Sequence, residues 1–411
     1  MKIKLFFILM LLTNSVLFAQ VKTECNKYYW SEWEYFKKHY ISDDGRVIDP
    51  AYGLDITTSE GQSYALFFAL VANDQAMFAS LIKWTENNLA AGDLSNNIPA
   101  WLWGKNEKGE WGIKDFNSAS NSDIWIAYSL LEAARLWNKP DYNALGTSLL
   151  KHIYAEEVAE LPNLGRILLP GKERFVYKNF WRLNPGNTPP QLLNKFNRID
   201  PIWNDVIKGN RRLLLESGVN GLASDWVVWD KKLGWQFYSE VIDWASKREI
   251  TKDNNILDVD AVKKNNPNIT VKKSFVRQHQ GNYNAIRVYL LIGMMAEDSK
   301  YRNELTKHYS PMIDIIRPGG LVPEIVNALE QRSEGTAPIG FSAALLPFSK
   351  DYMDMHAKLL DKVNEHILDP DEYHNIVLIL FGKGFDDKRY RFNKYGELLP
   401  EYLEHNNPCK L

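Results

Sequence analysis

The sequence has few of the residues that would indicate metal, redox or nucleic-acid chemistry. Only Cys25 and Cys409 are cysteines, and the eight histidines show no metal-ligand spacing of the HExxH or CxxC kind. Basic and acidic residues are nearly balanced, 49 against 51, and are well mixed, so no basic face for nucleic acid or an anionic membrane is expected. We therefore expect no metal, no cofactor and no nucleic-acid partner.

Long apolar runs are also missing, except near the N-terminus. Lys2 and Lys4 precede an apolar run at 5–12, and the small residue Ala19 follows, which is typical of a secretory signal peptide over residues 1–19. This run is shorter than the roughly 20 residues that span a bilayer, and no later run approaches that length. The pattern predicts an exported protein with no membrane span. In an oxidising compartment, a disulfide between the two cysteines becomes a candidate.

Residues 20–411 are predicted to form one domain, because no Pro/Ser-rich linker or charge block divides them. Apolar residues recur at helical spacing, with turns rich in Gly, Pro and Asn between the segments. The predicted helical segments are 63–72, 76–89, 124–137, 142–155, 205–215, 285–295, 312–316, 341–346 and 355–367. Alternation with period two is rare, so the pattern predicts an all-α domain with few short strands. The stretch 247–273, rich in Asn, Lys and Asp, is predicted to be an exposed insertion.

Glu60 is the first candidate functional residue. It lies where the polar stretch 57–60 meets the apolar stretch 65–70, in the first turn of a predicted helix with Ser59 or Thr58 as N-cap. A carboxylate there can point into a cleft, although the helix dipole alone also favours an acidic residue at this place. The 14 Trp and 20 Tyr are consistent with sugar stacking, although large helical cores use aromatic residues too.

Segments in order along nearly the whole chain resemble family 8 glycoside hydrolases, and most of all the secreted endoglucanases of bacterial cellulose-synthase operons. The similar segments are 45–50, 57–64, 99–105, 168–172, 212–216, 285–289, 340–344 and 396–400. The resemblance implies a closed (α/α)6 barrel, six inner helices ringed by six outer ones, with the cleft at one end. It also implies hydrolysis of a β-1,4-linked polysaccharide with inversion, by two carboxyl groups roughly 6.5–9.5 Å apart.

The resemblance assigns roles residue by residue. Glu60 matches the proton donor, which would need a raised pKa. Asp123 matches the second acid of a signature segment and is expected to contact the sugar at the cleavage point, or to cap its helix, while Asn121 replaces the first acid. Trp103 is expected to stack on sugar or to lie in the core. Further expected substrate contacts are Asp225, Trp226, Tyr283 and Arg287. Arg287 lies about one helical turn after position 284, so it is expected to hold the side chain at that position or a sugar hydroxyl.

Asn284 departs from the family pattern. Cellulose-operon relatives carry an aspartate there as general base, and an amide cannot accept a proton from water, although it can orient that water. Other branches take the base from a glutamate in an upstream insertion. Here 261–282 contains no Asp or Glu, so the nearest candidates are Glu249, Asp253, Asp258 and Asp260.

Three readings follow from these residues. The first is a secreted, periplasmic endo-β-1,4-glucanase of the cellulose-biosynthesis type, with the cellulose-synthase complex as a candidate partner. The second is a carbohydrate-binding protein that has kept the cleft and lost the base. The third is a hydrolase of another β-1,4-glycan, such as chitosan or xylan.

Overall fold

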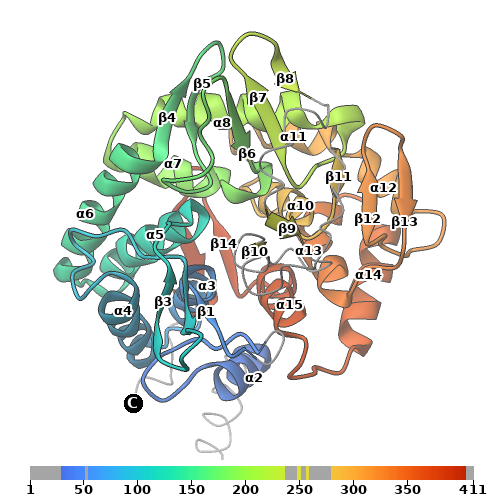
Figure 1. The fold of residues 1–411 in the computed structure, drawn as a ribbon. Coiled ribbons are helices and arrows are strands. Elements are labelled where there is room, and N and C mark those ends of the chain that lie inside the picture. The colour runs from blue at the N-terminus through green and yellow to red at the C-terminus, as the bar shows by residue number, and fades with distance from the viewer. Residues whose placement is uncertain (1–28, 51–53, 237–247, 251–255, 259–278, 404–411) are drawn as a thin grey trace, which may run out of the picture.

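A computed structural model describes residues 29–50, 54–236, 248–250, 256–258 and 279–403. The predicted signal peptide, both cysteines and most of the stretch 247–273 lie outside these residues. The helices form two concentric rings (Figure 1), which confirms the predicted (α/α)6 barrel. The inner helices are α3 (Ser59–Val71), α5 (Ser120–Trp137), α7 (Pro190–Ile199), α10 (Ala285–Gly293), α13 (Ile339–Ser349) and α15 (Tyr373–Asp386). The outer helices are α2 (Ser31–Tyr40), α4 (Gln75–Leu89), α6 (Pro140–Glu157), α8 (Trp203–Ser217), α11 (Arg302–His308), α12 (Pro311–Ile316) and α14 (Met353–Glu365).

The inner helices are apolar on nearly every side because they are covered by the outer ring and by each other. In α3, every residue from Gly61 to Val71 is buried, and Phe67 and Phe68 pack against Phe381 of α15 with ring centroids 5.6 and 4.7 Å apart. Gly382 brings α15 against α13, since a Cβ at this position would lie 1.8 Å from the Ala343 carbonyl oxygen. Close helix packing around the axis leaves room for function only at the helix ends.

Short antiparallel strands lie around the two rings of helices, as predicted from the rarity of period-two alternation in the sequence. Their bounds are β1 (Thr57–Thr58), β2 (Leu102–Lys105) and β3 (Trp111–Asp115) in one sheet; β4 (Val158–Leu161) and β5 (Gly165–Leu168); β6 (Phe180–Leu183), β7 (Val227–Asp230) and β8 (Gly234–Gln236); β9 (Arg248–Ile250) and β10 (Ile256–Asp258); β11 (Gln280–Gly281), β12 (Ile325–Asn327) and β13 (Arg332–Glu334); β14 (Tyr390–Phe392) and β15 (Leu398–Pro400). The 3₁₀ turns are η2 (Pro185–Asn187), η3 (Val219–Gly221) and η6 (Glu401–Leu403).

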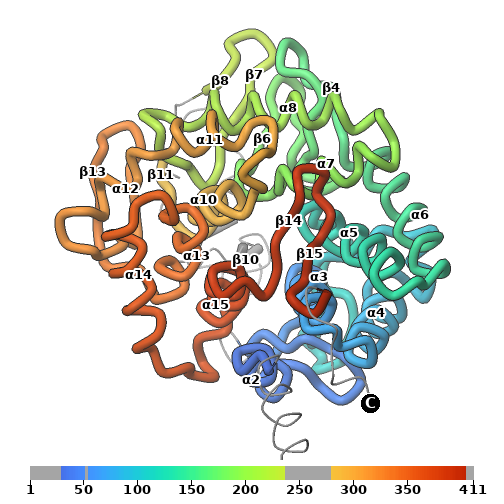
Figure 2. The backbone as a smooth tube through the Cα atoms, turned by 180° about the vertical axis from the view of Figure 1, so that it is seen from behind, coloured from blue at the N-terminus to red at the C-terminus, as the bar shows by residue number. Residues whose placement is uncertain are grey.

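The β14–β15 hairpin closes the back of the barrel (Figure 2). Its anchor is Glu132 of α5, which is fully buried and accepts a hydrogen bond from the Leu398 backbone N–H at 2.7 Å. Lys195 Nζ and Arg135 Nη2 lie 2.7 and 2.5 Å from the same carboxylate. Tyr128 also donates its hydroxyl to the Gly396 carbonyl at 2.9 Å. With this end sealed, the opposite end, where the inner helices begin, is the open one.

Candidate active site

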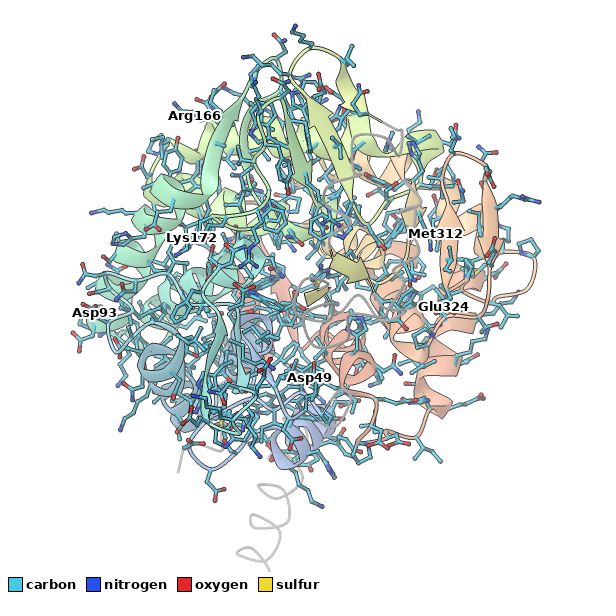
Figure 3. The ribbon with its side chains drawn as sticks, in the orientation of Figure 1. Asp49, Asp93, Arg166, Lys172, Met312 and Glu324 are labelled. Atoms are coloured by element: carbon cyan, nitrogen blue, oxygen red, sulfur yellow. The ribbon has the colours of Figure 1, made fainter. Side chains whose placement is uncertain are left out.

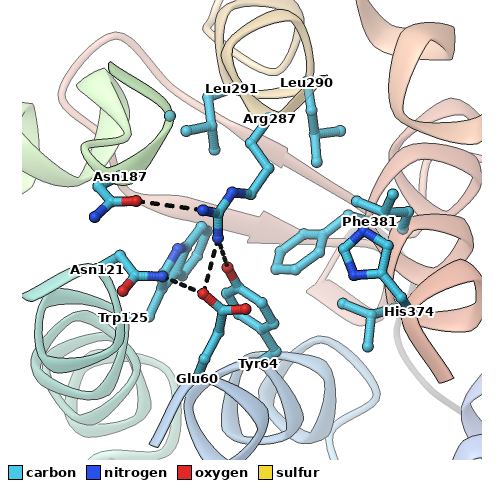
Figure 4. A pocket seen from close by; sticks show the side chains of 13 residues that line it. Glu60, Tyr64, Asn121, Trp125, Asn187, Arg287, Leu290, Leu291, His374 and Phe381 are labelled. Atoms are coloured by element: carbon cyan, nitrogen blue, oxygen red, sulfur yellow. Dashed lines mark hydrogen bonds and ion pairs between the residues drawn. The ribbon is translucent and has the colours of Figure 1, made fainter. Parts of the chain in front are cut away.

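Four inner helices begin at the same end of the barrel, and their first residues meet there (Figure 4). Glu60, Asn121 and His374 are each the second residue of their helix, α3, α5 and α15, and Asn284 is the N-cap of α10. Thr58 caps α3 by accepting the Gly61 N–H at 3.1 Å, which confirms the predicted helix start. The partial positive charge of each helix N-terminus therefore faces the same space, which favours an anion there.

These helix ends surround a small cavity on the barrel axis, called here the axial cavity. Its volume is about 20 Å³, enough for one water molecule. Both polar and apolar side chains line it: Glu60, Tyr64, Asn121, Asn187, Arg287, His374, Trp125, Leu290, Leu291, Val377, Leu378 and Phe381, with Gly186. The cavity thus brings one carboxylate, one guanidinium and one imidazole together.

Glu60 is held as an anion in this arrangement. Its Oε2 accepts hydrogen bonds from Arg287 Nη1 at 2.8 Å and from Asn121 Nδ2 at 2.5 Å. Burial at the helix ends tends to raise the pKa of Glu60, but the charge of Arg287 and the Asn121 hydrogen bond outweigh it, so the pKa lies below its usual value. The expected raised pKa is therefore wrong for the protein without substrate.

Arg287 connects Glu60 to position 284. Its Nη2 donates to the Asn284 Oδ1 and, at 3.3 Å, to Asn187 Oδ1, while its Nη1 also reaches the Tyr64 hydroxyl at 3.4 Å. Asn184 Nδ2 donates a second hydrogen bond to Asn284 Oδ1 at 3.0 Å. The expectation that Arg287 holds the side chain at position 284 is confirmed. With two donors on its oxygen, Asn284 presents only amide hydrogens to anything else.

Asp225 organises the backbone that carries Asn284. Its Oδ1 accepts the backbone N–H groups of Asn282, Asn284 and Ala285 at 2.8, 3.0 and 2.8 Å. Burial raises the pKa of Asp225 despite these hydrogen bonds. Tyr283 packs edge-on against His374, with ring centroids 5.2 Å apart. Asp225 therefore fixes the start of α10, and a contact with substrate stays a prediction for both residues.

Asp123 is not where the resemblance placed it. Its side chain is fully buried, and Glu157 rather than the axial cavity lies against it. Residues two apart on a helix point about 200° apart, so with Asn121 directed at Glu60, Asp123 must point away from it. The expected sugar contact of Asp123 is therefore wrong in this structure, and Ala119 is the N-cap of α5. Position 121 is the one that faces the reacting group.

The two expected tryptophans lie on different segments of the chain. Trp103 pairs with Thr57 next to the start of α3, and Trp226 follows Asp225. The ring of Trp103 stacks on Trp111 at 4.8 Å, and Trp84 packs edge-on against it at 5.3 Å. Trp111 is 45% exposed, so it presents the more open surface of the stacked pair.

Trp226 stacks on Phe175, with ring centroids 5.9 Å apart, and the Arg182 guanidinium lies 4.0 Å from the Trp226 ring. A role in sugar stacking therefore stays a prediction for Trp103 and Trp226.

His374 is a residue that the sequence did not single out. Burial lowers its pKa to about 4, so the imidazole is neutral at ordinary pH. Its Nε2 is shielded from solvent and meets no hydrogen-bond partner among the described residues. Tyr64, Asn184 and Asn187 were also missed, because each is an isolated polar residue in a helix or turn and no local spacing marks it. Only the spatial meeting of distant helix ends identifies them.

With this geometry in view, comparison with known proteins gives the class. The model of the family "Glycosyl hydrolases family 8" matches residues 6–252. The chain belongs to this family and is a glycoside hydrolase.

The particular relatives agree with that class. The chain is 44% identical to an endoglucanase of Salmonella typhi and 42% identical to one of Escherichia coli (strain K12), each over 91% of both chains. Among solved structures, it resembles the endo-1,4-D-glucanase of Vibrio fischeri ES114, with 38% identity, a TM-score of 0.74, and coverage of 91% of this chain and 100% of the other.

Two further observations concern the surroundings of the site. Within the described residues, no helix is both long enough and apolar enough to cross a bilayer, and no cluster of three or more His, Cys, Asp or Glu could hold a metal.

Of the candidate bases, Asp253 and Asp260 lie outside the described residues. Glu249 and Asp258 lie on β9 and β10, whose backbone projects onto the centre of the helical ring in Figure 1.

Proposed function

We propose that the protein hydrolyses internal bonds of a β-1,4-linked glucan with inversion of configuration, with Glu60 as the proton donor. The observation that carries the proposal is the Arg287 guanidinium, which joins the Glu60 carboxylate to the side chain at position 284. In an inverting glycosidase, an acid and a base flank the scissile bond. Glu60 and position 284 match the acid and the base of the family, and Arg287 contacts both side chains. The endoglucanase relatives support the substrate class.

The chemistry requires one proton to be given and one to be taken. Protonated Glu60 transfers its proton to the glycosidic oxygen as the bond from that oxygen to the anomeric carbon breaks. A water molecule attacks the anomeric carbon from the opposite face, and its proton passes to the base. Because Arg287 and Asn121 favour the Glu60 carboxylate, hydrolysis should be fastest at acidic pH, where more of Glu60 carries its proton.

Release of reducing ends from carboxymethylcellulose tests this assignment. Glu60→Gln keeps the size of the side chain but cannot donate an acidic proton, so it should lower kcat by at least about 100-fold. Glu107→Gln, the same change at an exposed position, is the matched control and should retain wild-type activity. Near-full activity of Glu60→Gln on a substrate with a poor leaving group would refute the role of Glu60. NMR of the first product anomer would report inversion.

We propose that a carboxylate of the insertion supplies the base, because the oxygen of Asn284 is occupied by Arg287 and Asn184. In the view of Figure 1, β9 and β10 lie in front of the centre of the ring, which supports this proposal. The candidates are Glu249, Asp253, Asp258 and Asp260. Replacing the true base with alanine should abolish hydrolysis, whereas Asn284→Asp should change little.

A second candidate function is carbohydrate binding without hydrolysis. It is favoured by the ionised state of Glu60 and by the amides at 121 and 284, where the family pattern has acids. In that case the wild type should be nearly inactive, and Asn284→Asp should raise activity about 100-fold or more, the scale of a positioned base. Calorimetry would still show heat of binding with cellohexaose. An inactive wild type that Asn284→Asp fails to rescue would point to Asn121 or a reshaped cleft.

The exact glycan and the cellular setting extend the proposal. Heat with chitosan or xylan oligomers, and none with millimolar cellohexaose, would move the substrate to another β-1,4-glycan. The N-terminal signal pattern supports secretion into the periplasm, where the protein would act in cellulose biosynthesis, with the cellulose-synthase complex as partner. Fractionation of cells producing the full chain, and co-purification with that complex, would test these two statements.

A further inference from the structure

The first turn of α5 faces two different environments. Asn121 points to the axial cavity and donates to Glu60 at 2.5 Å. Asp123, two residues further, is directed into the protein interior and has no solvent exposure. The position of this turn therefore decides how Asn121 meets Glu60, and the contacts of Asp123 decide the position of the turn.

Glu157, the last residue of α6, lies against Asp123. It is also fully buried, and the two carboxyl groups hydrogen-bond to each other. Both Asp123 oxygens and Glu157 Oε2 are buried, and within the described residues the donor that approaches Asp123 is the Ala119 backbone N–H, whereas Ser118 Oγ donates to Glu157 Oε1. Two carboxylates cannot both be charged in contact inside a dry interior, so a proton must lie between them.

The other groups that face this pair do not replace that proton. Burial raises the pKa of both carboxyl groups, and the mutual repulsion of their charges raises that of Asp123 further. The Lys172 ammonium, on the α5–α6 side of the molecule (Figure 3), and the Ala119 backbone N–H lower the pKa of Asp123 without reversing the shift. The Ser118 and Ser120 hydroxyls lower the pKa of Glu157, and Glu156 raises it, with a result of about 7.

The carboxyl pair joins three segments of the chain. Ser118, whose hydroxyl bonds to Glu157, accepts the backbone N–H of Lys172 at 3.0 Å. The Ser120 N–H donates to the Pro170 carbonyl at 3.1 Å, and the Leu169 N–H donates to the Glu157 carbonyl at 2.8 Å. The start of α5, the end of α6 and the segment after β5 are thus tied together around Asp123 and Glu157.

We propose that the proton shared by Asp123 and Glu157 positions the first turn of α5, and through Asn121 the Glu60 carboxyl, so that its loss adds a second fall in hydrolysis at alkaline pH to the fall caused by ionisation of Glu60. When the proton leaves to bulk water, two carboxylates remain in contact and repel each other. Relief of that repulsion moves α5 relative to α6, and Asn121 moves with α5. Asp123 and Glu157 are positioning residues in this account, which rests on the proposed hydrolase function.

The test is the pH profile of kcat/KM on carboxymethylcellulose. Asp123→Asn and Glu157→Gln each replace the shared proton with an amide donor that does not titrate. Between pH 6 and pH 9, kcat/KM of the wild type should fall about tenfold or more. For each variant, the fall relative to its own value at pH 6 should be about tenfold smaller than that of the wild type. Glu160→Gln, the same change at an exposed residue of β4, is the matched control and should keep the wild-type profile. Alkaline limbs that coincide in wild type and both variants would overturn the proposal.

A second readout separates this proposal from the hydrolase assignment. The infrared carbonyl band of a protonated carboxylic acid should be present in the wild type at pH 7, should disappear at alkaline pH, and should be absent from both variants at pH 7. The wild-type Tm should fall over the same pH range. If no form hydrolyses glucan but the band titrates, the proposed function fails while the shared proton stands. If the wild type lacks the band at pH 7, the shared proton is refuted, even when a variant does not fold.

Discussion

Glu60 and Asp123 are both acidic residues in the first turn of an inner helix, yet their surroundings move their pKa values in opposite directions. At Glu60, the Arg287 charge and the Asn121 amide overcome the effect of burial and lower the pKa. At Asp123, burial acts together with a second carboxyl group, Glu157, and raises it. The nearest partner, a cation in one case and an acid in the other, decides the outcome more than burial does.

The comparison also shows how charge is distributed around the open end of the barrel. The described lining of the axial cavity contains one acid, one guanidinium and a neutral imidazole. The interior behind α5 contains two acids, neither of which is paired with a base at salt-bridge distance within the described residues. Glu60 therefore faces the axial cavity, whereas Asp123 and Glu157 are buried in the protein interior.

Replacing each acid with alanine should show most clearly how the two sites differ. Asp123→Ala should lower the free energy of unfolding by about 3 kcal/mol, because it leaves a cavity and an unsatisfied Glu157 carboxyl in the core. Glu60→Ala should cost about 1 kcal/mol, because the Glu60 side chain is 38% exposed and Arg287 keeps three other partners. Urea denaturation at pH 6 measures both values. Equal losses would show that the two sites do not differ as described.

Adding an acid beside Glu60 should make the first site resemble the second. Asn121→Asp replaces an amide donor with a carboxyl group, which must share a proton with Glu60, so the pKa of Glu60 should rise. Provided the wild type hydrolyses glucan, activity at neutral pH should increase about tenfold, and the alkaline limb should move to higher pH. The pH profile of kcat/KM is the measurement. Asn121→Ser removes the amide without adding charge, and a similar gain with this control would exclude the electrostatic explanation.

His374 should make the stability of the folded protein depend on pH in the direction opposite to that of the Asp123–Glu157 pair. Its pKa is about 4 in the folded protein and near 6.5 when unfolded, so the unfolded chain binds more protons between these values. Stability should therefore decrease as pH falls from 6.5 to 4, by up to about 3 kcal/mol from this residue. His374→Gln should remove that contribution. Tm measured at pH 4.5 and 7 for both forms tests it, and parallel shifts would show that His374 does not contribute.

The helices were largely predictable, because amphipathic periodicity depends on local sequence. The segments predicted at 76–89 and 142–155 fall within α4 and α6. Two inner helices, α7 and α15, were missed. In α15 the run 375–382 is buried on every side, so it lacks the apolar and polar faces that mark a helix. His374, which lies on this helix, could not be identified for the same reason.

The site was predictable only where resemblance or helix capping applied. Glu60 and Arg287 were placed correctly relative to their helices, and the contact of Arg287 with position 284 was predicted from a spacing of three residues. The opposite directions of the Asn121 and Asp123 side chains could not be predicted, because both are polar residues in one helical turn. The buried partner of Asp123 is Glu157, which belongs to another helix.

The buried Glu132 carboxylate also has a consequence for the order in which the chain can fold. Its partner at Leu398 lies 266 residues further along the chain. At the usual 5–20 residues per second, a ribosome needs about 13–53 s to make that stretch. Until then α5 carries a carboxylate whose final hydrogen bond cannot form, and the back of the barrel is open. The closing step must therefore come late in synthesis or after it, and the nascent chain is exposed to proteases and chaperones for that time.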